Sequence, residues 1–120
     1  MYNKRSNSEE LHVVRDFTHV EDIVNGLILA SNFKPKSPEE MIFNMSAGYK
    51  TSILELAEIM IEMLNMKGKL KPESGILKDH EPLGMGADSS KAEKLLGWSK
   101  RLPPRETIKK YIHWRKMNNT

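Results

Sequence analysis

Four segments with the 3.6-residue repeat of an amphipathic helix constrain the fold of this 120-residue chain most strongly. The first runs over about 19–31, with Thr18-x-x-Glu21 as a capping box at its start and Pro35 beyond its end. The other three are bounded by similar signals, namely a Ser or Asp start, a Gly stop or a Pro in the first turn. They are a stretch after Ser52 with Ile53, Leu56, Ala57, Met60 and Leu64 as its apolar stripe, about 89–96 between Asp88 and Gly97, and Pro104 to about Met117. Helices should therefore dominate the fold.

Strand signals are fewer and shorter. The stretches His12–Phe17 and Met41–Met45 have the composition of strands, and Lys69–Pro72 is a weaker candidate. The pattern predicts a helix-rich α+β domain over residues 11–120, with about four helices and two or three short strands. Residues 1–10 are almost wholly polar and are expected to form a flexible lead-in.

Composition excludes several classes of site. The chain has no cysteine, which rules out disulfides, thiolate zinc sites and thiol nucleophiles and fits a reducing cytoplasm. No apolar run reaches the ~18–20 residues of a membrane span. The four histidines lack metal-ligand spacing, and His19 is interpreted as a packing residue. We therefore expect no metal site and no membrane association, and we expect the protein in the cytoplasm.

The C-terminal segment is basic and contains aromatic residues. From Lys91 onward there are nine Lys or Arg against two Glu, interleaved with Trp98, Tyr111 and Trp114, a pattern that can bind nucleic acid. The helical spacing favours another interpretation, in which Trp98 packs on Leu95. Tyr111 and Trp114 would then share the apolar side of the last helix with Ile108 and Ile112. A small basic nucleic-acid-binding domain stays the less favoured alternative, since the net charge of the chain is only +3.

Five sequence blocks, read together, point to a family. They are Arg15-Asp16-Phe17-Thr18-His19-Val20-Glu21-Asp22, Phe43-Asn44-Met45-Ser46-Ala47-Gly48, Thr51-Ser52-Ile53-Leu54-Glu55-Leu56-Ala57, Asp88 to Trp98 (D-x-S-K-A-x-x-x-L-G-W), and Ile108 to Trp114. In this order they resemble the C-terminal, sugar-nucleotide-binding part of the extended short-chain dehydrogenase/reductases, the NAD-dependent nucleotide-sugar epimerases and dehydratases. The resemblance extends from about Val13 to Trp114. It implies that the fold is the C-terminal lobe of a Rossmann-type enzyme.

The motifs of the catalytic half are missing. Gly84-Met85-Gly86 is the only G-x-G, and Ser89 stands where the third glycine of a dinucleotide turn would be. None of the three tyrosines has a lysine four residues later, so the family's Tyr-x-x-x-Lys pair is absent. The resemblance therefore implies that the catalytic Rossmann domain is absent and that this chain alone binds no cofactor and is inactive. The full enzyme would carry NAD or NADP.

Two cations are candidate substrate-binding residues. Arg15 matches the family arginine that approaches the substrate diphosphate, and a guanidinium suits phosphate oxygens. From the sequence alone, a salt bridge to Asp16 or Asp22 is the alternative. Lys78, ten residues before Asp88, matches a second family arginine but lacks the bidentate fork and the proline that follows it there. Its alternative is a solvated loop lysine. No catalytic, cofactor-binding or metal-binding residue is predicted.

The resemblance thus implies a substrate-binding fragment that positions a nucleotide diphosphate-sugar against NAD(P) on a missing Rossmann half. A truncated interaction module that docks on a full-length homologue is the main alternative. Without the Rossmann half the lobe should expose apolar surface, and such surface favours self-association.

Overall fold

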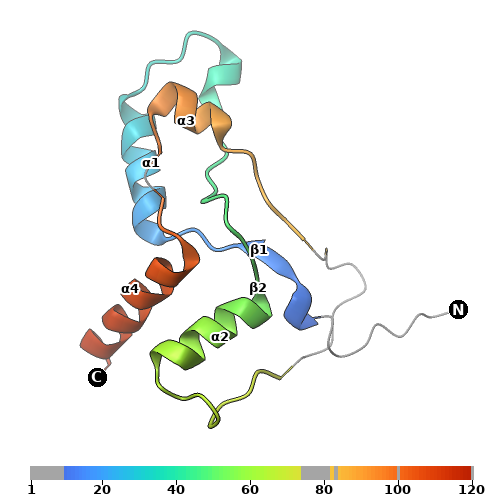
Figure 1. Cartoon of the computed structure of the whole chain (residues 1–120). Coiled ribbons are helices and arrows are strands. Elements are labelled where there is room, and N and C mark those ends of the chain that lie inside the picture. Colours follow the sequence, from blue (N-terminus) through green and yellow to red (C-terminus); the bar gives the residue numbers. More distant parts are fainter. Residues whose placement is uncertain (1–9, 74–81, 83, 100, 120) are drawn as a thin grey trace, which may run out of the picture.

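The computed structural model describes residues 10–73, 82, 84–99 and 101–119. Within these ranges the architecture consists of four α-helices and one two-stranded sheet, which confirms the helix-rich α+β prediction (Figure 1). The elements are β1 (Val14–Asp16), α1 (Val20–Asn32), β2 (Lys50–Ser52), α2 (Ile53–Met63), α3 (Ser90–Leu96) and α4 (Pro104–Met117), with short 3-10 turns at Glu10–His12 and Pro38–Met41. No helix in these described ranges is long and apolar enough to cross a membrane.

The helices form two pairs with the sheet between them. Helix α1 packs with α3, and α2 packs with α4, as Figure 1 shows. Strands β1 and β2 are antiparallel, with Arg15 opposite Thr51 and Asp16 opposite Lys50. On its other side β1 meets the segment around Gly84, where the Met85 N–H donates to the Val14 carbonyl at 3.2 Å. Residues from three distant parts of the sequence therefore meet at β1.

Trp98 is the centre of the core around α1 and α3. It is 2% exposed, packs with Ala92 and Leu96, and donates its indole N–H to the Asp22 carbonyl at 2.8 Å. The predicted packing on Leu95 is wrong, because Leu95 is not part of this cluster. Gly97 ends α3 with a positive φ of 69° and redirects the chain, so that Trp98 contacts the inner side of the helix.

Of the two N-cap residues predicted for α1 and α2, one is confirmed and one is wrong. The Ser52 hydroxyl accepts from the Glu55 N–H at 3.0 Å, which confirms that cap. The capping box at Thr18 is wrong, since His19 is the N-cap of α1 and its Nδ1 accepts from the Glu21 N–H at 3.1 Å. The Thr18 hydroxyl is instead bound to Asp16.

The start of α3 lies one residue later than predicted. Ser89 is its N-cap and does not use its side chain for that purpose. Asp88, the predicted cap, still accepts from the Ser90 N–H at 2.9 Å. The carboxylate therefore satisfies the first helical N–H from one position further out.

The strand predictions succeed only at β1, which is shorter than the predicted 12–17. The Met41–Met45 strand is wrong, because Met41 ends a 3-10 turn and residues 42–49 have no regular structure. The partner of β1 is Lys50–Ser52. Lys69–Pro72 contributes only an isolated bridge between Lys67 and Leu70. The predicted lead-in falls almost entirely on residues 1–9, outside the described part of the chain.

The apolar repeat of α1 predicts the helix, but of its members Val20, Ile23, Val24 and Leu27 only Ile23 packs against the core around Trp98. Val20, Val24 and Leu27 are exposed, whereas the buried residues of α1 are Asp22 and Gly26. A side chain at Gly26 would run into Met45 and lie 3.2 Å from Trp98 Nε1. Glycine therefore permits close packing on a side of the helix that hydrophobicity does not mark.

Candidate functional site

Arg15 is held at the meeting point of the three segments around β1. Its Nη1 donates to the carbonyl oxygens of Val14 and Pro82, each at 2.9 Å. The side chain is half-buried. These bonds hold the guanidinium against the segment that runs alongside β1 near Gly84. The second predicted residue, Lys78, lies outside the described residues.

Asp16 binds more donors than sequence reasoning suggested. Its Oδ1 accepts from the Thr18 hydroxyl at 3.0 Å and the Ala47 N–H at 3.2 Å. Its Oδ2 accepts from the Gly48 N–H at 2.7 Å and from the Ser46 hydroxyl. The carboxylate thus closes the turn that leads into β2 and holds it against the end of β1. The run Ser46-Ala47-Gly48 supplies three of these four donors, but Ser46 lies 30 residues from Asp16, so there was no local signal.

Asp22 also has a structural role. It is 4% exposed, and its Oδ2 accepts from the Leu102 N–H at 2.9 Å. Both carboxylates that the sequence offered as salt-bridge partners of Arg15 therefore bind other donors. The contacts described for Asp16 and Asp22 do not support that alternative.

The D-x-S-K-A block holds neighbouring backbone in place. The Ser89 hydroxyl accepts from the Ser46 N–H at 2.8 Å and donates to the Ser46 carbonyl at 3.0 Å. Lys91 Nζ donates to the Glu39 carbonyl at 2.7 Å. This block therefore fixes the chain that connects α1 to β2 and contributes no reactive group here.

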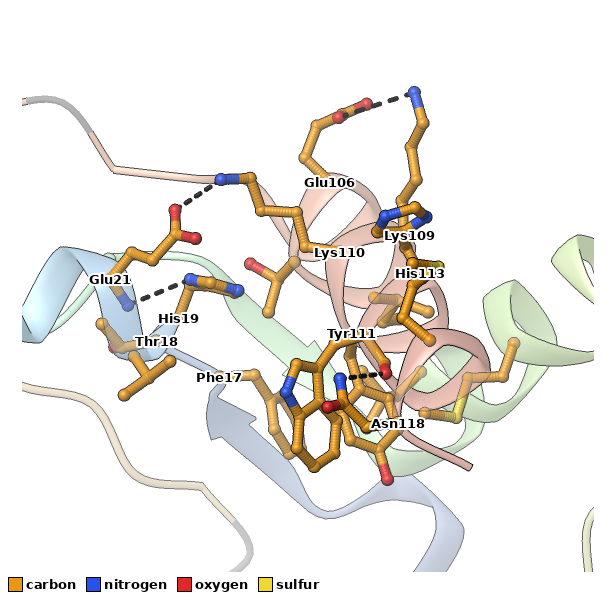
Figure 2. Close-up of a pocket in the computed structure, with 17 residues that line it drawn as sticks. Phe17, Thr18, His19, Glu21, Glu106, Lys109, Lys110, Tyr111, His113 and Asn118 are labelled. Atoms are coloured by element: carbon orange, nitrogen blue, oxygen red, sulfur yellow. Dashed lines mark hydrogen bonds and ion pairs between the residues drawn. The ribbon is translucent and has the colours of Figure 1, made fainter. Parts of the chain in front are cut away.

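An open apolar groove of about 1310 Å³ lies between the start of α1 and helices α2 and α4. Tyr111 and Trp114 stack in it with ring centroids 6.4 Å apart. Figure 2 shows the Glu21–Lys110 pair and the Glu106–Lys109 pair at this site. The hydrogen bond from Lys110 holds the pKa of the Glu21 carboxylate below its ordinary value. Arg15 is not among the residues that line the groove, so the structure does not bring the predicted phosphate ligand to this hollow.

Four basic residues of the C-terminal segment, Arg101, Arg105, Lys109 and Lys110, pair with carboxylates. Arg101 pairs with Glu93 and lies 5.1 Å from the ring centre of Trp98, which is buried. Arg105 pairs with Glu62 at 2.7 Å, and Lys110 pairs with Glu21. Tyr111 and Trp114 are 48% and 55% exposed on the same helix, so the nucleic-acid alternative stays an untested prediction. Within the described ranges no group of three or more His, Asp or Glu side chains is placed to hold a metal ion.

Comparison with known proteins agrees with the fold. No family model matches the sequence. A putative UDP-glucose 4-epimerase of Methanocaldococcus jannaschii is 32% identical over 108 residues, which are 88% of this chain and 32% of that protein. The enzyme WbmF of Bordetella bronchiseptica, crystallised with NAD+ and UDP, matches with a TM-score of 0.71 and 27% identity over 91% of this chain and 30% of its own. UDP-glucose 4-epimerase from Bifidobacterium longum, also in complex with NAD+ and UDP, gives a TM-score of 0.68 and 26% identity over 88% of this chain and 31% of its own.

These findings place the chain in the extended short-chain dehydrogenase/reductases, the family of NAD-dependent nucleotide-sugar epimerases and dehydratases. Within that family its fold is that of the C-terminal lobe. The chain spans about a third of the length of the relatives that it matches.

Proposed function

We propose that this chain is the substrate-binding part of a NAD(P)-dependent nucleotide-sugar epimerase or dehydratase and that it holds the diphosphate of the substrate. The observation that carries this proposal is the placement of Arg15. It belongs to the R-D-F block, is half-buried in β1, and is oriented by the carbonyls of Val14 and Pro82. The presence of UDP in both matched crystal structures supports a nucleotide ligand for this fold.

The physical basis is the geometry of the guanidinium. Arginine presents five N–H donors in a planar fork that matches two phosphate oxygens, and it stays charged at any physiological pH. A side chain whose orientation is already fixed loses less freedom when the ligand arrives. Lys78 would add a second positive charge. Lys78 itself lies outside the described residues.

The chemistry would belong to the other half of the enzyme. NAD(P) bound there would exchange hydride with the sugar, and this lobe would hold the nucleotide so that the sugar meets the nicotinamide. Such orientation is a large share of catalysis for a tethered reaction. No residue of this chain is assigned a proton or hydride transfer.

The test joins the chain to its catalytic half and compares Arg15→Lys with Arg15→Ala. Hydrogen bonds to charged groups contribute roughly 1.5–3 kcal/mol, so Ala should weaken nucleotide-sugar binding by about one to two orders of magnitude, with Lys in between. Because Arg15 contacts the nucleotide and not the reacting carbons, the loss should appear mainly in KM and less in kcat.

Arg105→Ala is the matched control. Like Arg15, Arg105 is a hydrogen-bonded arginine, but its partner is Glu62, so it joins α4 to α2. Arg105→Ala should leave KM unchanged. If Arg15 is purely structural, Arg15→Ala should lower the melting temperature and leave nucleotide affinity intact. A stable Arg15→Ala enzyme with normal KM would show that Arg15 is not part of the site.

A further inference from the structure

The Arg15 side chain leans toward one side of β1. Strand β1 has β2 on one side and the segment around Gly84 on the other. The Val14 carbonyl faces the Gly84 side, because it accepts from the Met85 N–H. Arg15 Nη1 donates to that carbonyl and to the Pro82 carbonyl, each at 2.9 Å. The guanidinium therefore lies on the side of β1 that is away from β2.

Thr51 fills the other side of Arg15. It is the residue of β2 directly opposite Arg15, and the Ile53 N–H continues this register by donating to the Val13 carbonyl at 3.0 Å. Opposite residues of an antiparallel pair share a face, with Cβ atoms about 4.5–5.5 Å apart. Thr51 is 2% exposed and is the one buried residue of β2. A packed side chain thus occupies the space into which Arg15 would swing toward β2.

The shape of Thr51 matters more here than its hydroxyl. Its Oγ1 donates to the Tyr49 carbonyl at 3.5 Å, a distance at which a hydrogen bond is weak. The two branches on its Cβ restrict rotation about χ1, so the side chain forms a stiff wall. Serine at this position would keep the hydroxyl but lose the methyl branch. Valine would keep both branches and lose the hydroxyl.

We propose that Thr51 is a positioning residue for Arg15, closing the β2 side and keeping the guanidinium beside Pro82. The inference rests on the proposed function for the ligand, a diphosphate bound by Arg15. In this role Thr51 does not touch the nucleotide. Immobilising a rotamer-rich side chain when a ligand binds weakens affinity by about two- to tenfold, and a guanidinium that is already held avoids most of this loss.

Nitrogen-15 relaxation of the arginine Nε–H groups in the 120-residue chain tests the positioning without any ligand. Arg15 should be more ordered on the picosecond to nanosecond timescale than Arg115, which is exposed near the end of α4. Thr51→Ser should lower the order parameter of Arg15 toward that of Arg115. Thr51→Val, the matched control, should leave it unchanged.

The chain joined to its catalytic half tests the consequence for binding. Thr51→Ser should raise KM for the nucleotide-sugar by about two- to tenfold with little change in kcat, and Thr51→Val should restore the normal KM. In an Arg15→Ala background, Thr51→Ser should have no further effect on KM, because no guanidinium remains to be positioned. A merely structural Thr51 would change KM equally in both backgrounds.

The two measurements separate this inference from the proposed function. A normal KM for Arg15→Ala would overturn the proposed function, and the inference would lose its ligand. A raised KM for Arg15→Ala, with Thr51→Ser leaving both KM and the order of Arg15 unchanged, would overturn the inference alone. So would an Arg15 as mobile as Arg115 in the unmodified chain. If Thr51→Ser fails to fold, Thr51→Cys, which also has a single branch on Cβ, takes its place.

Discussion

Replacing Asp16 with asparagine should destabilise the lobe more than the small chemical change suggests. Each carboxylate oxygen accepts two hydrogen bonds. Oδ1 accepts from Thr18 and Ala47, and Oδ2 accepts from Ser46 and Gly48. Asparagine has the same shape but replaces one oxygen with an NH2 group, which can only donate. The Thr18 and Ser46 hydroxyls can rotate to accept from that group. With the NH2 group in place of Oδ2, the Gly48 N–H loses its acceptor. With the NH2 group in place of Oδ1, the Ala47 N–H loses the carboxylate and keeps only the Thr18 hydroxyl.

The magnitude follows from that count. The variant loses at least one hydrogen bond between a charged acceptor and a backbone N–H, an interaction that contributes roughly 1.5–3 kcal/mol. The remaining bonds to a neutral amide oxygen are weaker than those to a carboxylate. We therefore expect the free energy of unfolding to fall by about 2–3 kcal/mol. Asp16→Ala removes all four acceptor interactions and should cost more.

Urea unfolding followed by circular dichroism measures this change, with Asp88→Asn as the matched control. Asp88 accepts both of its hydrogen bonds, from the Ser90 N–H and hydroxyl, on Oδ1. An asparagine there keeps that oxygen, so its effect should be much smaller. Equal stabilities for Asp16→Asn and the unmodified chain would show that the turn at residues 46–48 does not depend on the carboxylate.

Two further predictions concern helix ends and charge pairs. Ser52→Ala and His19→Ala each remove an acceptor for a helix N–H and should lower the free energy of unfolding, followed by thermal melts, by about 0.5–2 kcal/mol. His19→Asn should keep the cap of α1. Unchanged melting of both Ala variants would mean that these caps contribute nothing. The hydrogen bond from Arg105 holds the pKa of the Glu62 carboxylate below its ordinary value. The stabilisation of the fold by this pair is therefore complete above about pH 4.5 and is lost as the pH falls through the lowered pKa. Glu62→Gln should remove that part of the acid sensitivity, and salt should weaken it in the unmodified chain because the pair is exposed. Melts from pH 3 to 6 that are parallel for both proteins would contradict this.

Helix ends are predictable from sequence where their signals are local. Pro104 begins α4 and Met117 ends it, as predicted, and the Ser52 cap and the Gly97 stop are both where the sequence places them. In each case the decisive interaction lies within a few residues of the signal. A proline in the first turn or a glycine with positive φ acts on its own backbone, and tertiary contacts have little to change.

The sequence predictions failed where a residue distant in the sequence decides which hydrogen bonds a local segment forms. Thr18 fits a capping box, but the Asp16 carboxylate and the Ala47 N–H bind its hydroxyl, and His19 caps the helix instead. The strand at Met41–Met45 failed for a related reason. A strand is defined by its partner, and the described residues place none beside it. Composition marks a segment that can pair but cannot say whether a partner strand is present.

Arg15 and Asp16 illustrate how one motif separates ligand binding from stability. Successive residues of a strand point to opposite faces, so neighbouring opposite charges on β1 face away from each other. Asp16 collects its donors from the turn before β2, while Arg15 is oriented by the carbonyls of Val14 and Pro82. If the proposed function holds, the two residues should separate experimentally in the rejoined enzyme. Asp16→Asn should lower the free energy of unfolding with modest change in KM below the melting temperature, and Arg15→Ala should raise KM with modest change in stability. Parallel losses of both quantities in both variants would mean that the R-D pair acts as one structural unit, and the assignment of Arg15 to the diphosphate would then fail.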